Sequence, residues 1–221
     1  IHQYERNQVA SGIAFNPIVG LYLYPRGEQF AQERYFERYD AATGYAKQYW
    51  IAGSGTPDTP ANLGENIQNP YWIAYRNLRP ATKNRYMFSA KASYKIVDNL
   101  EVAARFRMDN TSSTMDDKRY ASTLPVYAGT NGYYAHWKET FKQQYADVIV
   151  HYNERFSDFG LDAHIGASYE GYDTQVEGYR GNLINVNNFT QSNISTPAAI
   201  NHPLWGKRSN TAFFAMAEID W

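Results

Sequence analysis

His151 and His164 are the residues of this sequence best suited to metal chemistry. The chain has five histidines and no cysteine, so a thiolate metal site, a disulfide and a cysteine nucleophile are excluded. Both histidines lie in segments of alternating apolar and polar residues, which place them diagonally across one polar face. Asp147 or Asp162 could supply a third ligand. Histidines on polar faces usually make ordinary hydrogen bonds, and from the sequence we prefer this interpretation to a metal site. We predict no cofactor.

Aromatic side chains are the second group with recognisable chemistry. The chain has 20 Tyr, 11 Phe and 5 Trp, which suits aromatic girdles at a membrane or sugar-binding surfaces. Several of the largest rings fall outside the predicted strands, beside Asn and Asp side chains, where they suit sugar or peptide recognition. The alternative is that each ring holds a long loop in place. The candidate substrate-binding residues are Trp50, Tyr71, Trp72, Tyr133, Tyr134 and Trp137, and Trp205 is a further loop tryptophan.

Local signatures of an enzyme are absent. The sequence contains no GxSxG, HExxH or P-loop pattern, and no neighbouring carboxylates suggest glycosidase geometry. The formal net charge is -1 and no basic run is present, which argues against nucleic acid as a partner. We therefore predict a protein that is not an enzyme and has no catalytic residues.

Strands and hairpins must position these side chains. Every second residue is apolar from Tyr86 to Ile96, and the alternation resumes from Leu100 to Met108 after the turn 97–99. A period of two predicts strands with one apolar and one polar face, and a short polar connection makes the two strands a hairpin. The same pattern recurs twice more. The predicted strands are about 85–96, 100–109, 144–156, 161–172 and 208–221.

Short and long connections alternate along the chain. Turns 97–99 and 157–160 are short, whereas connections 16–83, 110–143 and 173–207 are long. Each strand has the ~9–11 residues that a tilted strand needs to cross a bilayer. Short periplasmic turns and long extracellular loops are typical of outer-membrane barrels. We therefore predict an all-β fold, an antiparallel transmembrane β-barrel whose apolar face meets lipid and whose polar face lines a lumen.

The hairpins also carry register predictions. Like charges directly opposite each other on neighbouring strands are destabilising, so we expect an acidic side chain to reach Lys91 and Arg105. A slip of one residue would move every side chain to the other face. The predicted pairs are Ile96 with Leu100, Lys95 with Glu101, Lys91 with Arg105, Phe156 with Leu161 and Arg155 with Asp162.

Several short motifs resemble the SusC/RagA family of TonB-dependent outer-membrane transporters. The resemblance covers essentially the whole chain. The motifs are Asn16-Pro17 with GLYLYPRG at 20–27, QNPYWI at 68–73 with Arg76-Asn77, RYM at 85–87 opening an alternating strand, YAS at 120–122 and GNL at 181–183.

The resemblance implies that residues 1–221 are part of a large barrel, 22-stranded in this family, with three of its extracellular loops. The family's plug domain and TonB-interacting segment are not found in the sequence, and we expect the chain to be a fragment of a longer protein. Family members import oligosaccharides or peptides across the outer membrane of Gram-negative bacteria. The implied partners are a SusD-like surface lipoprotein, the TonB complex, outer-membrane lipid and an oligosaccharide or peptide ligand. No catalytic residue is carried over.

Two other functions fit the same residue pattern. One is a passive porin-type or adhesion barrel without energy coupling. The other is a soluble carbohydrate-binding β-sandwich, in which one face of each sheet packs on a second sheet. Strands of 10 to 14 residues are long for a sandwich, because globular strands usually have ~5–6 residues.

Overall fold

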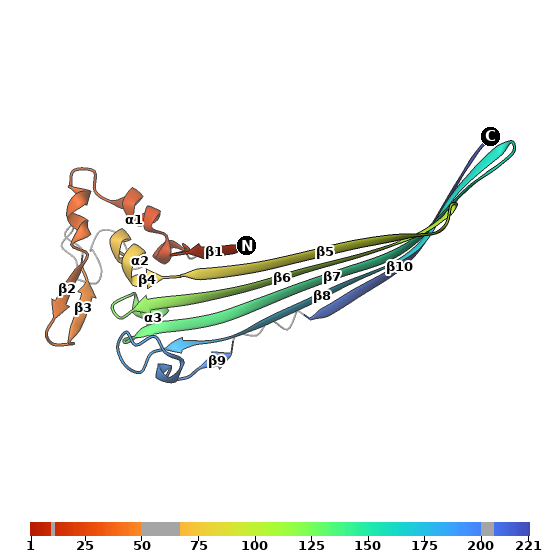
Figure 1. Ribbon diagram of the computed structural model, residues 1–221. Coiled ribbons are helices and arrows are strands. Elements are labelled where there is room, and N and C mark those ends of the chain that lie inside the picture. The colour runs from red at the N-terminus through yellow and green to blue at the C-terminus, as the bar shows by residue number, and fades with distance from the viewer. Residues whose placement is uncertain (10–11, 50–66, 200–205) are drawn as a thin grey trace.

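One long antiparallel sheet dominates the computed structural model, which describes residues 1–9, 12–49, 67–199 and 206–221 (Figure 1). Within these residues the sheet has eight strands, and its predicted antiparallel all-β class is confirmed. Its main path is β1 (His2–Glu5), β5 (Ala81–Val97), β6 (Leu100–Tyr120), β7 (Gly132–Phe156), β8 (Phe159–Asn182) and β10 (Lys207–Asp220). Two short strands extend it, β4 (Asn77–Leu78) beside β6 and β9 (Ala198–Ala199) beside β8.

The shorter elements gather at one end of this sheet, and both tight turns and the C-terminus lie at the other end (Figure 1). Asn16 and Asn69 cap two of the helices, since each side chain accepts a hydrogen bond from the backbone two residues on and a proline follows. No helix in the described ranges is both long and apolar enough to cross a membrane. The elements are α1 (Pro17–Leu23), α2 (Pro70–Arg76), α3 (Pro125–Ala128), the hairpin β2 (Glu37–Asp40) and β3 (Tyr45–Gln48), and 3-10 turns at Ile13–Phe15, Phe30–Arg34 and Gln191–Asn193.

The long strands continue well past the ends predicted from alternation. β6 has 21 residues and β7 has 25, and they pair from Leu100–Tyr152 to Tyr120–Gly132. Residues 110–143 are therefore mostly paired strand rather than loop, and their connection shortens to 121–131. The prediction missed this because DNTSST at 109–114 is polar on both faces. Backbone pairing does not require alternation, which reports only where one face is apolar.

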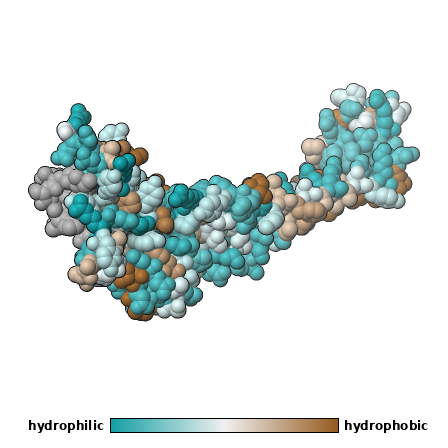
Figure 2. Space-filling model, turned by 60° about the vertical axis from the view of Figure 1, so that its left-hand side comes forward, coloured by the Kyte–Doolittle hydropathy of each residue, from teal (hydrophilic) through white to brown (hydrophobic). Residues whose placement is uncertain are grey.

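The two faces of the sheet differ in chemistry where the strands approach the tight turns. Directly paired residues share a face, so the register groups the side chains into rows across the sheet. The apolar face is exposed, with Val148 48% and Phe213 83% accessible. Figure 2 shows hydrophobic residues along the narrow part of the sheet, between hydrophilic regions at both ends. One apolar row contains Ala92, Ala104, Val148, Ala167 and Phe213, and the next contains Tyr94, Val102, Val150, Ile165 and Ala215.

The first hairpin has the predicted faces but a different closing pair. Lys95 pairs with Glu101 and Lys91 with Arg105, as expected. The prediction that Ile96 pairs with Leu100 is wrong: Val97 is the partner of Leu100, and an irregularity lies between Lys95 and Val97. A bulge at residue 96 absorbs the extra residue, so the connection closes as a two-residue turn without moving any other side chain to the wrong face.

The second hairpin is tighter than predicted. Phe156 pairs with Phe159 rather than Leu161, and their rings stack with centroids 5.1 Å apart. Ser157, with φ of 33°, begins a two-residue turn, which is shorter than the predicted turn 157–160. The predicted pair of Arg155 with Asp162 is therefore wrong, because Asn153 is the residue opposite Asp162. The partner shifts by two residues, which preserves the face of every side chain.

Candidate functional site

The polar face of the sheet carries an ion pair where like charges meet. Lys91 and Arg105 are directly opposite each other, and Asp147 of β7 lies next to Arg105 in the same row. Arg105 Nε donates to both carboxylate oxygens of Asp147 at 3.0 Å, and the Tyr145 hydroxyl donates to Oδ2 at 2.7 Å. The expected acidic side chain is confirmed for Arg105, where the neighbouring strand supplies Asp147; for Lys91 it stays a prediction.

A second ion pair lies on the same face nearer the outer end, where the short elements gather. Arg85 Nε donates to Asp109 Oδ1 at 3.0 Å, and its NH2 group also contacts Asp109. Gln143, paired with Asp109, donates to Glu170 Oε1 at 2.9 Å. Ion pairs and hydrogen bonds therefore connect charged side chains of both signs along this face. A wall built in this way suits a water-filled passage better than contact with hydrocarbon.

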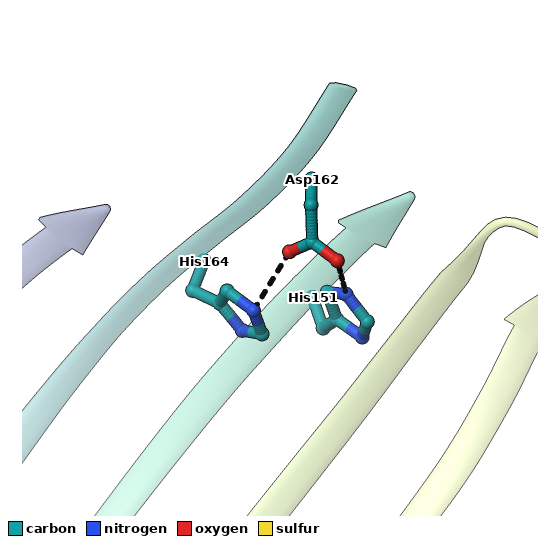
Figure 3. Close-up of side chains that lie close together, drawn as sticks. All are labelled: His151, Asp162 and His164. Atoms are coloured by element: carbon teal, nitrogen blue, oxygen red, sulfur yellow. Dashed lines mark hydrogen bonds and ion pairs between the residues drawn. The ribbon is translucent and has the colours of Figure 1, made fainter. Parts of the chain in front are cut away.

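The two strand histidines lie closer together than predicted. His151 and His164 are directly opposite rather than diagonal, and their imidazole rings stack with centroids 4.2 Å apart. Asp162 contacts both rings, whereas Asp147 is held by Arg105 (Figure 3). The alternation alone does not distinguish Asp147 from Asp162 as the third group; the tight turn sets the register and brings Asp162 to the two rings.

Two of the candidate aromatics pack inside the connections, Trp72 against the connection 121–131 and Tyr71 within its own connection. Trp72 on α2 is 1% exposed, and its Nε1 donates to Thr123 Oγ1 at 3.0 Å. Tyr71 stacks on Phe30 and Phe36, with centroids 5.6 and 6.5 Å apart. The buried side-chain amides of Gln68 and Asn69 donate to backbone carbonyls nearby. Trp72 is almost completely enclosed. Its observed contacts match the alternative interpretation of a ring that holds a loop in place.

Tyr134 and Tyr133 lie on β7, so the expectation that they fall outside the strands is wrong. Tyr134 is buried beneath the third connection, and its hydroxyl donates to Asp116 Oδ1 at 3.1 Å. Burial, followed by the nearby Asp116 charge, raises the pKa of the Tyr134 phenol well above its usual range. Tyr133 is half-buried on the opposite face, with Arg119 over its ring at 4.6 Å. Burial also raises the pKa of the Tyr133 phenol.

Trp137, also on β7, lines a cleft at the outer end of the sheet. The cleft has a volume of about 320 Å³ and is lined by residues from four strands. Arg79 lies 6.0 Å from the Trp137 ring centroid. A flat ring beside amide, hydroxyl and charged groups of both signs can bind a polar ligand. The lining includes Gln3, Glu5, Lys83, Ser113, Trp137 and Glu139.

Sequence reasoning missed most of this cleft. Lys83, Ser113 and Glu139 form one row across β5, β6 and β7, and β1 brings Gln3 beside Lys83. Only continuation of the strand register past residue 109 would have grouped them. Trp50 and Trp205, the remaining loop tryptophans named from the sequence, lie outside the described residues. So does the Gly- and Pro-rich segment 52–66 that follows Trp50.

Comparison with known proteins gives matches among solved structures alone, because no protein-family model and no curated protein sequence matches the chain. The RagAB peptide importer in its open-open state aligns with 83% of this chain at 17% identity and a TM-score of 0.57. Its closed-closed state aligns with 70% at 15% identity and a TM-score of 0.57, and a further structure of the RagAB peptide transporter aligns with 82% at 15% identity and a TM-score of 0.52.

The alignment covers only 17 to 19% of the length of those solved chains. Identity at this level reports the fold rather than the activity. The likeness agrees with the SusC/RagA resemblance inferred from the short motifs. The long strands of this chain have the same arrangement as strands in those solved structures. In fold, this chain is therefore similar to a segment of the RagAB peptide importer.

Proposed function

We propose that this chain forms part of the wall of an outer-membrane barrel that imports oligosaccharides or peptides. The observation that carries the proposal is the contrast between the two faces of β5 to β8 near their tight turns. One face exposes rows of Ala, Val, Ile and Phe, and the other carries Lys91, Arg105 and Asp147. A soluble protein rarely exposes so large an apolar surface, whereas lipid covers it at no cost.

The long strands then divide into two parts with different tasks. The part near turns 98–99 and 157–158 crosses the bilayer, and the outer part extends beyond it toward the cleft beside Trp137. In the proposed arrangement, the described parts of connections 16–80, 121–131 and 183–206 face outward from the cell. Ligand enters from that side, with a SusD-like surface lipoprotein as the partner and TonB as the source of energy.

The chemistry of the cleft bears on the class of ligand. Glu5, Glu139 and Lys83 place charges of both signs around the Trp137 ring. A peptide carries both charges and apolar side chains, while a neutral oligosaccharide uses stacking and hydroxyl groups. The mixed charge favours a peptide, and Trp137 serves either ligand. Tyr133 joins Trp137 as a proposed contact because it is half-buried on the same face of β7.

Uptake by whole cells tests the proposal. The gene encoding the full-length protein would be deleted and restored, and uptake of labelled peptides and oligosaccharides measured with and without a protonophore. We expect the protein in the outer-membrane fraction and uptake that requires both the gene and the proton gradient. Uptake that survives the protonophore supports a passive barrel instead. Recovery of the intact protein in the detergent-free soluble fraction contradicts the barrel and supports the β-sandwich.

A further inference from the structure

His151, Asp162 and His164 converge at one point of the polar face, next to the second tight turn (Figure 3). Because the two histidines are paired directly across β7 and β8, their rings stack nearly parallel, with 4° between their planes. Asp162 lies two residues before His164 and so shares its face. Each carboxylate oxygen reaches one ring, Oδ1 to His164 Nε2 at 2.8 Å and Oδ2 to His151 Nε2 at 3.1 Å.

Both imidazoles therefore present the same nitrogen to one carboxylate, and the three ligand atoms lie within 4.8 Å of one another. A divalent ion between them would accept the Nε2 lone pair of each neutral ring, with the ring proton carried on Nδ1. A tetrahedral ion bound at 2.0–2.1 Å holds its ligand atoms about 3.4 Å apart. Binding therefore requires the two rings to turn out of their parallel stack, about their side-chain bonds, so that both Nε2 lone pairs point at the ion.

The surroundings of the three side chains suit a bound cation. Asn153 Nδ2 donates to Asp162 Oδ2 at 3.0 Å, which holds the carboxylate in its orientation. Glu101 is paired with His151, and Glu218 is paired with Asp162, so acidic residues flank the group on both sides. About a third of each of the three side chains is exposed, at 36%, 35% and 30% for His151, Asp162 and His164, which leaves room for water ligands.

We propose that His151, Asp162 and His164 bind one divalent transition-metal ion, with Zn²⁺ as the reference ion. Two imidazoles and one carboxylate form a ligand set that suits first-row transition metals. Mg²⁺ and Ca²⁺ prefer oxygen ligands throughout, and two of the three donors here are nitrogen. The inference rests on these side chains alone and does not depend on the import function.

Metal titration of the full-length protein tests the site. The purified protein in detergent would be stripped with EDTA, dialysed, and titrated with Zn²⁺ against a chromophoric chelator. We expect the wild type to bind one equivalent of Zn²⁺ that the variants His151→Gln and Asp162→Asn bind at least tenfold more weakly. Mg²⁺ should compete poorly. The absorption spectrum of bound Co²⁺ should change in the same two variants.

His136→Gln is the matched control. His136 Nδ1 contacts Asp116 Oδ1 at 2.7 Å, so this variant also breaks a histidine–carboxylate contact. Among the described residues, His136 belongs to no group of three metal-binding side chains. It should keep the full stoichiometry. The proposal is overturned if wild type and His151→Gln bind the same number of Zn²⁺ ions with equal affinity, or if His136→Gln loses the same equivalent. Thermal unfolding of each variant confirms that a loss of binding is not a loss of fold.

Discussion

Arg105 of β6 and Asp147 of β7 form an ion pair in the row that also contains Lys91. Arg105 NH2 lies 2.7 Å from Asp147 Oδ2, in addition to the two contacts made by Nε. The Asp147 side chain is 1% exposed, while that of Arg105 is 51% exposed. The carboxylate is thus enclosed by its partners, and the cation stays in contact with water. This arrangement permits Lys91 and Arg105 to occupy directly opposite positions.

Replacing Asp147 with Asn should destabilise the sheet. The variant leaves Lys91 and Arg105 facing each other without the carboxylate, and we expect a loss of about 1–2 kcal/mol in the free energy of unfolding, moderated by the exposure of Arg105. Urea unfolding of the full-length protein in lipid vesicles measures it. Asp158→Asn in the exposed turn is the control and should change little. Equal stability of both variants would contradict this role for Asp147.

Arginine substitutions at two adjacent positions distinguish a lipid face from a lumenal face. Val148 lies in the middle of the apolar rows, and Ile149 is its neighbour on the polar face at the same depth. Val148→Arg should cost about 2–4 kcal/mol of folding free energy in a bilayer, and Ile149→Arg much less, because only the first places a charge in hydrocarbon. The heat-modified mobility shift of the folded protein on gels reports assembly. Similar behaviour of the two variants would exclude a lipid-facing Val148.

Two tryptophans should separate structural from ligand-binding roles. Trp72→Phe removes the hydrogen bond to Thr123 and leaves a small void, which should loosen α2 by about 1–3 kcal/mol. Limited proteolysis of the first connection detects this loosening. Trp137→Phe should weaken ligand uptake, because Trp137 lines the cleft. It should leave the rate of proteolysis unchanged, because Trp137 lies on β7 and not in the first connection. Faster proteolysis of both variants would remove the distinction.

The phenol of Tyr24 should lose its proton at a higher pH than an ordinary tyrosine. Its hydroxyl donates to Glu33 Oε1 at 3.1 Å, and burial, followed by the Glu33 charge, raises the pKa of Tyr24 to about 12. An unfolded tyrosine has a pKa near 10. Because the pKa is higher in the folded state, the protonated phenol contributes its full stabilisation below pH 10. This contribution is lost as the pH rises through about 12. The difference in absorbance at about 295 nm between wild type and Tyr24→Phe isolates this phenol.

Glu33→Gln provides the accompanying control for that titration. The substitution removes a negative charge next to Tyr24 and keeps a side chain of the same size. The pKa of Tyr24 should fall toward its ordinary value, because one of its causes is removed while burial remains. An unchanged titration in Glu33→Gln would assign the shift to burial alone.

The paired strands near the turns were predictable from the sequence because one face there is apolar. Alternation placed Lys95 opposite Glu101 and Lys91 opposite Arg105 correctly. It failed at the turns, since neither a bulged residue in the first hairpin nor a two-residue shift in the second changes the face of the other side chains: Val97 and Phe159, rather than Ile96 and Leu161, close the hairpins. It also failed beyond residue 109, where both faces are polar and the pattern carries no information about pairing.

The candidate sites were predictable only in part, because each joins residues whose proximity depends on register. His151 and His164 were identified as a pair, but their direct opposition follows from the two-residue turn at 157–158. This geometry is what turns an ordinary polar pair into a candidate metal site. The cleft beside Trp137 escaped prediction since Gln3 and Glu139 are far apart in the sequence. Trp72 looked the same as Trp137 in sequence and differs from it in burial.

The uninterrupted pairing of β6 with β7 has a mechanical consequence. The 21 residues of β6 span about 70 Å, so one continuous ladder of backbone hydrogen bonds runs from Leu100, beside the tight turns, to Tyr120 at the far end. Such a ribbon behaves as a stiff beam. A force applied at the end far from the tight turns should therefore tilt the whole strand pair, because no hinge interrupts it. The backbone amides of β6 and β7 should exchange slowly along the full length of the pairing.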